Sequence, residues 1–354
     1  MTSMTAVATV VVGGIDTHKD LHVAAVVDRD DGRLLATKEF STTRAGHRAV
    51  LRWLRDHGDI EAVGIEGTGS YGAGVMRFLT EAGLTVFEVD RPDRSDRRRR
   101  TKSDTVDAEM AARAVLSGRR LSAPKSKSGK VEALRVLRLT RAGAIRSRVK
   151  ALQLLRSHAI SAPDEVRDLV RELTRMQMLR TVAAWRPDYD DYQHPATATR
   201  IAMRSLARRI LELNNEIADL DELIEPLVVE LGARLLARPC VGIETAGQLL
   251  VTAGDNPDRL RSEAAWAMLC GVAPLPASSG KTDRHRLNRG GDRQANRALH
   301  MIAIGRLRTD ADTKAYAARR TAEGKSKLET IRCIKRYLAR ETYPLLKVSI
   351  NPED

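Results

Sequence analysis

The sequence predicts an α/β domain followed by a mainly helical region, and three observations indicate it. Strand and helix patterns alternate from residue 1 to about 124. Residues 129–230 show helical periodicity with many charges, and residues 231–354 form a second, mainly helical part. With 354 residues the chain can bury more than one core, so we expect three parts: 1–124, 129–230 and 231–354.

The N-terminal part predicts five strands and two helices, with a further helix starting near residue 104. Runs of β-branched residues indicate strands, the turn RDDG joins two of them into a hairpin, and Gly83 ends the second helix. In chain order the elements are the strand AVATVVVGGID, the hairpin LHVAAVVDRDDGRLLATKEFS, the helix AGHRAVLRWLRDHG, the strand IEAVGIEG, the helix YGAGVMRFLTEAG and the strand LTVFEVD. This order describes a mixed sheet with helices on its faces, as in the ribonuclease H-like (RuvC-like) fold.

The central region predicts a coiled coil. Seven apolar residues alternate four and three apart, which is the spacing of a coiled-coil seam. They are Leu206, Ile210, Leu213, Ile217, Leu220, Ile224 and Leu227. Such a seam offers a route to a homodimer. The preceding helical segment, VEALRVLRLTRAGAIRSRVKALQLLRSH, is rich in arginine, and its polar face is either solvated or turned toward nucleic acid.

The C-terminal part opens on LLARPCVGIETAGQLLVTAGD, which predicts a helix, a tight turn and a second helix. This pattern resembles a helix-hairpin-helix, whose turn offers backbone N–H groups to a phosphate. Cys240 stands where that motif usually has its first glycine, so a plain helical turn is the alternative. A loop rich in glycine, serine and arginine follows and enters another helix.

Composition favours a polyanionic partner and an intracellular protein. The formal net charge is +14, and nucleic acid is the usual partner of so basic a chain. Cys240, Cys270 and Cys333 are widely spaced without a CxxC pair, which indicates neither a disulfide framework nor a zinc site and fits a reducing cytoplasm. The apolar start is about ten residues long, too short for a membrane span, and it runs into Asp16, which argues against a signal peptide.

Four carboxylates are candidates for a metal site. Asp16 and Glu66 end the first and fourth strands, which are neighbours in a ribonuclease H-like sheet, and Asp104 and Asp107 share one face of a later helix. Four close carboxylates repel one another unless a cation offsets them. Hard oxygen ligands suit Mg²⁺, and two ions about 4 Å apart can clamp a phosphodiester. Taken singly, each acid could instead be a turn or cap residue.

A run of basic residues precedes the last two acids. It would hold a nucleic-acid backbone while the acids hold the metal that acts on it. The run comprises Arg97, Arg98, Arg99, Arg100 and Lys102.

Four motifs resemble one family closely. GIDTHK, IEGTGSYG, KSDTVDAEMAA and CGVAPLPASSGKTDRHRLNRGGDRQANRAL are similar to motifs of the DEDD transposases of the insertion-sequence 110 family, recombinases guided by a bridge RNA. The resemblance covers nearly the whole chain. It implies that the four acids bind magnesium and that a C-terminal serine forms a covalent bond to a DNA phosphate. That serine is Ser279, with a one-residue ambiguity toward Ser278. The resemblance also implies double-stranded donor and target DNA as partners, and a tetramer that brings the two together.

The loop around the serine is strongly basic. Its cations would stabilise charge on the phosphate in the transition state, or would contact DNA or RNA in a more general way. They are Lys281, Arg284, Arg286, Arg289 and Arg293. His285 is a phosphate contact or a proton shuttle. Aromatic residues make up only 3% of the chain, too few for base-stacking platforms, which is compatible with recognition by a guide RNA.

Three other functions are compatible with parts of this pattern. A sugar-kinase or actin-like ATPase shares the sheet, but its phosphate loop needs small residues where this chain has Thr17, His18 and Lys19. A non-catalytic nucleic-acid-binding protein would need neither the acids nor the serine. A metal-dependent junction resolvase would need the acids but not the serine, and it is the nearest enzymatic alternative.

Overall fold

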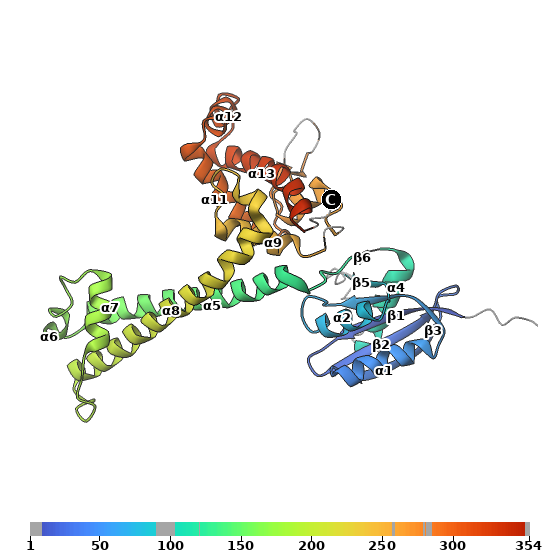
Figure 1. The fold of residues 1–354 in the computed structure, drawn as a ribbon, viewed down its shortest axis with the longest axis horizontal. Helices are drawn as coiled ribbons and strands as arrows, with labels where there is room; N and C mark the ends of the chain where they lie inside the picture. The colour runs from blue at the N-terminus through green and yellow to red at the C-terminus, as the bar shows by residue number, and fades with distance from the viewer. Residues whose placement is uncertain are drawn as a thin grey trace, which may run out of the picture. The chain divides into compact units, whose positions relative to one another are not determined.

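The computed structural model describes residues 9–89, 103–119, 121–256, 259–278, 280 and 285–350, with side chains up to residue 347. Within these ranges the chain forms two compact units. One comprises the residues up to 128 together with 253–265, and the other comprises 129–252 with the residues from 266 onward. Each unit is described separately below (Figure 1). The three-part division expected from the sequence stays a prediction.

The first unit is built on a mixed sheet with strand order β3-β2-β1-β4-β5-β6. β2 is antiparallel to β1 and to β3, β4 is parallel to β1 and to β5, and the short β6 is antiparallel to β5. The predicted hairpin and the predicted mixed sheet are therefore confirmed. The strands are β1 (Val10–Thr17), β2 (Leu21–Asp28), β3 (Leu34–Ser41), β4 (Asp59–Glu66), β5 (Val86–Val89) and β6 (Leu121–Ser122).

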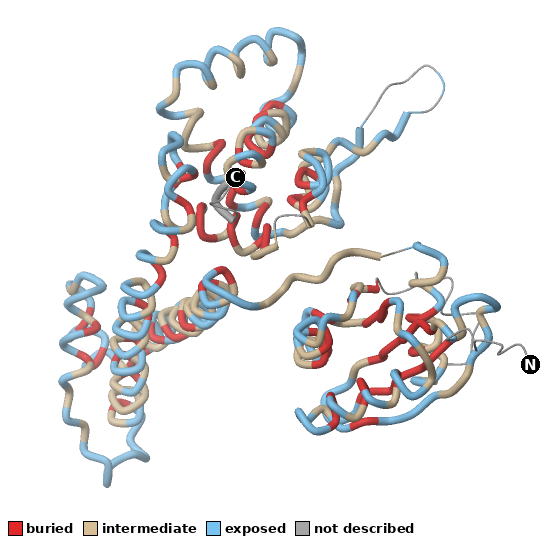
Figure 2. The backbone as a smooth tube through the Cα atoms, turned by 45° about the vertical axis from the view of Figure 1, so that its right-hand side comes forward, coloured by how far each residue is buried: buried red, intermediate tan, exposed pale blue. Residues whose placement is uncertain are grey.

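Helices cover both faces of this sheet. Alternate residues of a strand point to opposite faces. Val11 and Ile15 of β1 belong to a core cluster with residues of α1 (Arg44–Arg55) and α2 (Ala73–Glu81). On the other face, Val12 packs against α4 (Asp104–Ser117). Figure 2 shows the buried backbone concentrated in the strands and in the helix sides that meet them.

α4 lies unusually close to the sheet because glycine and alanine line the contact. A Cβ atom added to Gly14 would lie 2.1 Å from the carbonyl oxygen of Ala108, and one added to Gly64 would lie 2.5 Å from that of Ala111. Both distances are far below van der Waals contact, so only glycine fits at these two strand positions while the helix stays where it is. The helix backbone is thereby pressed directly onto β1 and β4.

Residues 253–265 belong to the first unit because they bind the segment that follows β6. The side chain of Asn256 donates a hydrogen bond to the carbonyl of Pro124 (2.6 Å), and Arg259 donates one to the carbonyl of Ala123 (3.1 Å). Asp255 accepts a hydrogen bond from the backbone N–H of Ser128 (3.0 Å).

The second unit contains a two-helix arm formed by α5 (Gly129–Ser161) and α8 (Pro195–Leu236), which pack along each other (Figure 1). Between them come the short α6 (Asp164–Arg167) and α7 (Arg175–Ala184), which share a core with both long helices. The predicted helical character is confirmed. The partner across the seam of α8 is a helix of the same chain, and the predicted homodimer stays a prediction.

The residues of this seam differ in part from those expected. Ile210, Ile217 and Ile224 are buried as predicted. The predicted leucines between them, Leu206, Leu213, Leu220 and Leu227, are only half-buried. Of the residues that follow them, Ala207 and Val228 are buried, whereas Asn214 and Asp221 are half-buried like the leucines before them.

The two polar seam residues have arginine partners on α5. Arg148 donates a hydrogen bond to the side-chain oxygen of Asn214 (3.0 Å), and Arg141 binds both oxygens of Asp221 (2.5 and 3.1 Å). Polar residues are tolerated in this seam because their hydrogen-bonding groups are satisfied there.

The rest of the second unit is a helical cluster with one short hairpin. Cys240, in the turn before α9, has a left-handed backbone (φ 61°), which is the conformation for which the related motif uses glycine. Its side chain lies against Gly305, where an added Cβ would meet the cysteine Cβ at 2.9 Å. The elements are α9 (Ile243–Ala253), α10 (Glu263–Leu269), β7 (Leu275–Pro276), β8 (His285–Arg286), α11 (Arg293–Thr309), α12 (Ala311–Ala322) and α13 (Lys327–Ile350). Among the described residues, no helix combines the length and apolar character that crossing a bilayer requires.

The close contact at α4 predicts the effect of adding one methyl group. Gly14→Ala forces the helix or the strand to move, and we expect it to lower the free energy of unfolding by roughly 1–3 kcal/mol, as overpacking does. The measurement is the urea midpoint of the full chain. Gly69→Ala is the matched control because no atom lies within 4 Å of an added Cβ there. Equal midpoints for the two variants would contradict the close contact.

Candidate active site

Two of the candidate acids stand at the ends of neighbouring parallel strands. Ile15 pairs with Ile65, so Asp16 and Glu66 follow at the same edge of the sheet. Every second residue of a strand points to the same face of the sheet. Asp16 therefore shares the face of Val12, and Glu66 shares the face of Gly64, which is the face covered by α4. The hydroxyl of Thr17 donates a hydrogen bond to the carbonyl of Glu66 (2.8 Å), which ties the two strand ends together.

The other two acids stand in the first turn of α4. Ser103 precedes the helix with an extended backbone, and Asp104 and Asp107 are the acidic residues of the first turn. Negative charge is favoured at this end of a helix because the backbone N–H groups there have no helical partner. The close contact of α4 with Gly14 therefore brings its negatively charged first turn to the edge of the sheet where Asp16 lies.

His18 joins the two groups of acids. Its Nε2 lies 3.0 Å from a carboxylate oxygen of Asp16 and 3.4 Å from one of Asp104. Ligand atoms of these three side chains all lie within 4.8 Å of one another. A role for His18 at this site was not predicted from the sequence. The sequence does contain a feature that could have indicated this role. His18 lies two residues after Asp16, and residues two apart in an extended chain point to the same face.

Asp16 is the acid whose charge is least favourable. It is 7% exposed. Burial raises its pKa above the usual value, and the negative charges of Glu66 and Asp107 raise it further, while His18 and the N–H of Thr17 act in the opposite direction. Glu66 and Asp107 thus lie near enough to act on the charge of Asp16, and Asp104 lies beside the same histidine as Asp16.

The donor set fits a hard divalent cation. The carboxylates come from β1, β4 and the start of α4, and oxygen-rich sites of this kind are typical of magnesium. A cation would offset the repulsion that raises the pKa of Asp16. Asp16 and Asp104 are the carboxylates that would hold it, with the imidazole of His18 beside them. Glu66 and Asp107, which act on Asp16 electrostatically, stay predicted ligands.

The remaining predicted site residues divide into two groups. Arg286, Arg289 and Arg293 lie around β8 and the start of α11, where they line a cleft of the second unit. The other basic candidates, Arg97 to Arg100, Lys102, Lys281 and Arg284, lie outside the described residues, as does Ser279. Ser278 is described and exposed.

Two family models match this chain. One, for DEDD transposases of IS110 elements, is described as transposase and covers residues 13–160, which include all four acids. The other, described as transposase of the IS116/IS110/IS902 family, covers residues 232–318. The chain belongs to the IS110 family of transposases. It is an enzyme with a DEDD catalytic domain, and this domain implies a carboxylate site for divalent metal.

Two relatives of this transposase come from bacterial insertion elements. An IS900 protein of Mycobacterium paratuberculosis, described as an uncharacterized 42 kDa protein, is 24% identical over 375 residues, which cover 91% of this chain and 92% of that protein. An IS110 protein of Streptomyces coelicolor, described as an uncharacterized 43.6 kDa protein, is 33% identical over 142 residues. This second match covers 39% of the chain and spans 35% of the Streptomyces protein.

The electrostatics of the acidic site predict opposite effects of one substitution. Asp16→Asn removes a buried charge that is repelled by Glu66 and Asp107, so we expect the transposase without divalent metal to unfold at a higher temperature near pH 7. The sign follows because a carboxylate whose pKa is raised by folding destabilises the fold at pH values above its pKa. The same variant should lose the increase in Tm that added Mg²⁺ or Mn²⁺ produces in the natural protein.

Thermal unfolding with and without metal measures both effects. Asp30→Asn is the matched control, since the side chain of Asp30 is 81% exposed, away from the cluster. If Asp16→Asn kept the full metal-dependent shift, the ion would not be held at this site.

Proposed function

We propose that this transposase cuts and rejoins DNA strands through a covalent serine intermediate, with two magnesium ions held by Asp16, Glu66, Asp104 and Asp107. The observation that carries the proposal is the cluster of Asp16, His18 and Asp104, on whose buried Asp16 the charges of Glu66 and Asp107 also act, in a chain that two transposase family models match. Magnesium bound there would supply Lewis-acid stabilisation of the phosphate and of the oxygen that leaves it.

Ser279 is the proposed nucleophile. A bond forms between its hydroxyl oxygen and a DNA phosphorus atom while a phosphorus–oxygen bond of the DNA backbone breaks, and the freed DNA hydroxyl takes up a proton. Reversal with a different DNA hydroxyl rejoins strands without ATP, because the phosphodiester energy is kept in the phosphoserine bond. A serine hydroxyl is a weak nucleophile at neutral pH and needs a base or a metal to activate it. The acids and the serine must therefore come together, either within one chain or between protomers.

The basic residues near the serine and before α4 are suited to the negative charge of the DNA phosphates. Guanidinium groups near the serine stabilise a phosphate as negative charge builds up on its oxygens. We assign this role to Arg286, Arg289 and Arg293, which lie together in the second unit, and to Lys281 and Arg284 from the sequence. Arg97 to Arg100 and Lys102, just before α4, are proposed to hold the DNA backbone beside the acids.

The partners are proposed from the family resemblance. Target choice by a bridge RNA is compatible with the scarcity of aromatic residues, since base pairing then reads the sequence while the protein holds the backbone. Dimerisation through the α5–α8 arm and a tetramer at synapsis would bring donor and target DNA together. The reaction would take place in the cytoplasm, where the DNA of a bacterial cell lies.

Recombination by two variants separates this proposal from hydrolysis by a junction resolvase. Asp16→Ala should abolish both strand cleavage and rejoining, whereas Ser279→Ala should abolish recombination and the covalent protein–DNA adduct. Ser278→Ala is the matched neighbour and should retain both. The assay is exchange between donor and target plasmids with the guide RNA supplied, together with recovery of the adduct after denaturation. Recombination by Ser279→Ala at the natural rate would favour the resolvase.

A further inference from the structure

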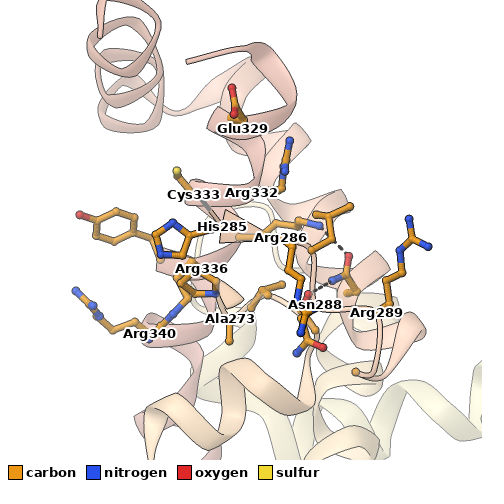
Figure 3. Close-up of a pocket in the computed structure, with 18 of the residues that line it drawn as sticks. Ala273, His285, Arg286, Asn288, Arg289, Glu329, Arg332, Cys333, Arg336 and Arg340 are labelled. Carbon is orange, nitrogen blue, oxygen red and sulfur yellow. Dashed lines mark hydrogen bonds between the residues drawn. The ribbon is translucent and has the colours of Figure 1, made fainter. Parts of the chain in front are cut away.

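A second cationic surface lies on α13, across a cleft from β8 and the residues that follow it. The hairpin β7–β8, the start of α11, α12 and α13 enclose a cleft of about 1030 Å³. This volume is at the upper end of the range of roughly 300–1,000 Å³ for small-molecule pockets. Figure 3 shows Arg332, Arg336 and Arg340 of α13 on the side of the cleft that faces His285 and Arg286.

The cations of α13 form a row on one face of the helix. Arg332, Arg336 and Arg340 follow one another at i, i+4, so they lie on one face of the helix. Like charges at this spacing destabilise a helix by roughly 0.2–0.5 kcal/mol per pair. Burial lowers the pKa of Arg336 and the charge of Arg340 lowers it further, and burial and Arg332 do the same to the pKa of Lys335. A polyanion seated on this face would offset the repulsion.

The cleft is built on a fixed hydrogen-bond network. Lys335 Nζ donates a hydrogen bond to the side-chain oxygen of Asn296 on α11 (2.8 Å). The amide nitrogen of Asn296 donates in turn to the carbonyls of Cys270 (3.0 Å) and Gly271 (2.9 Å), in the turn that leads to β7. α13 is thereby tied through α11 to the turn that precedes β7, which holds these described parts of the cleft together.

The aromatic residues of the cleft support its cations. The rings of Tyr316 and Tyr337 form an edge-to-face pair with centroids 5.2 Å apart. Arg320 lies over Tyr316 at 5.2 Å and Arg340 over Tyr337 at 5.6 Å. Guanidinium groups thus occupy ring faces on which bases would otherwise stack, which favours contact with phosphates over contact with bases. Glu329, the one carboxylate of the described lining, is engaged by the backbone N–H and the hydroxyl of Ser326.

We propose that this cleft holds the sugar–phosphate backbone of the DNA strand next to the phosphate that the serine attacks, with Arg332, Arg336 and Arg340 on one wall and Arg286, Arg289 and Arg293 on the other. Eight residues of helix span about 12 Å at 1.5 Å per residue. One DNA strand carries a charge roughly every 3.4 Å of duplex axis, so the row matches three to four consecutive phosphates. DNA is the assigned occupant because Arg286 on the facing wall follows Ser279 by seven residues in the sequence, and in this respect the inference rests on the proposed function.

The test is the salt dependence of DNA binding by the full chain. Arg332→Gln with Arg336→Gln should reduce the slope of log K against log[KCl] by about 1.8 on a 30-base-pair duplex, at roughly 0.9 per lost phosphate contact. The reduction should be the same for unrelated sequences, and Arg332→Lys with Arg336→Lys should restore the slope. The matched control is Arg175→Gln with Arg180→Gln, two exposed arginines of α7. Circular dichroism checks that all variants are folded.

This experiment measures DNA binding and not recombination. Its outcome therefore does not depend on whether the Ser279→Ala variant recombines DNA. A smaller slope on duplex DNA, with or without the same change on an RNA hairpin of equal length, supports the cleft as the DNA site. An unchanged DNA slope, a change confined to the RNA probe, or an equal change in the α7 control overturns the proposal.

Discussion

The contact between the backbone of α4 and two glycines of the sheet is the constraint on which the acidic site depends. Gly14 and Gly64 leave no room for a side chain, and the alanines of α4 fill the space instead. Because strand residues alternate between faces, the same contact places Asp16 and Glu66 on the side where the helix begins. If larger residues replaced these glycines, α4 would have to lie farther from the sheet. The acids in its first turn would then be separated from the acids of the strands.

The second unit contains two groups of arginines that lie in different surroundings. Arg141 and Arg148 are used within the protein, since each offsets a polar residue in the seam between α5 and α8. The arginines of α13 lie in an open cleft instead, where they repel one another. Arg141 stabilises the arm through its ion pair with Asp221, whereas the row on α13 presents several positive charges to one cleft, which suits an anionic partner.

The sequence predicted the sheet and its four acids because both follow from local patterns. Strand periodicity and turn residues define β1 to β5, and Asp16 and Glu66 each end a strand that has a known neighbour in this sheet order. His18 was missed because its role depends on where α4 places Asp104, which periodicity does not report. The seam of α8 was shifted for a similar reason: Asn214 and Asp221 look like surface residues until their arginine partners on α5 are known. The row on α13 was not predicted because arginines four residues apart are typical of a solvated helix face, and only the tertiary fold places β8 across from them.

The most direct measurement is the position of the metal in crystals of the full chain grown with Mn²⁺, found by anomalous scattering. The account predicts a peak bound by Asp16 together with Glu66 or a carboxylate from the first turn of α4. Ions that bind only elsewhere, or a peak at this edge of the sheet without Asp16 among its ligands, would contradict it.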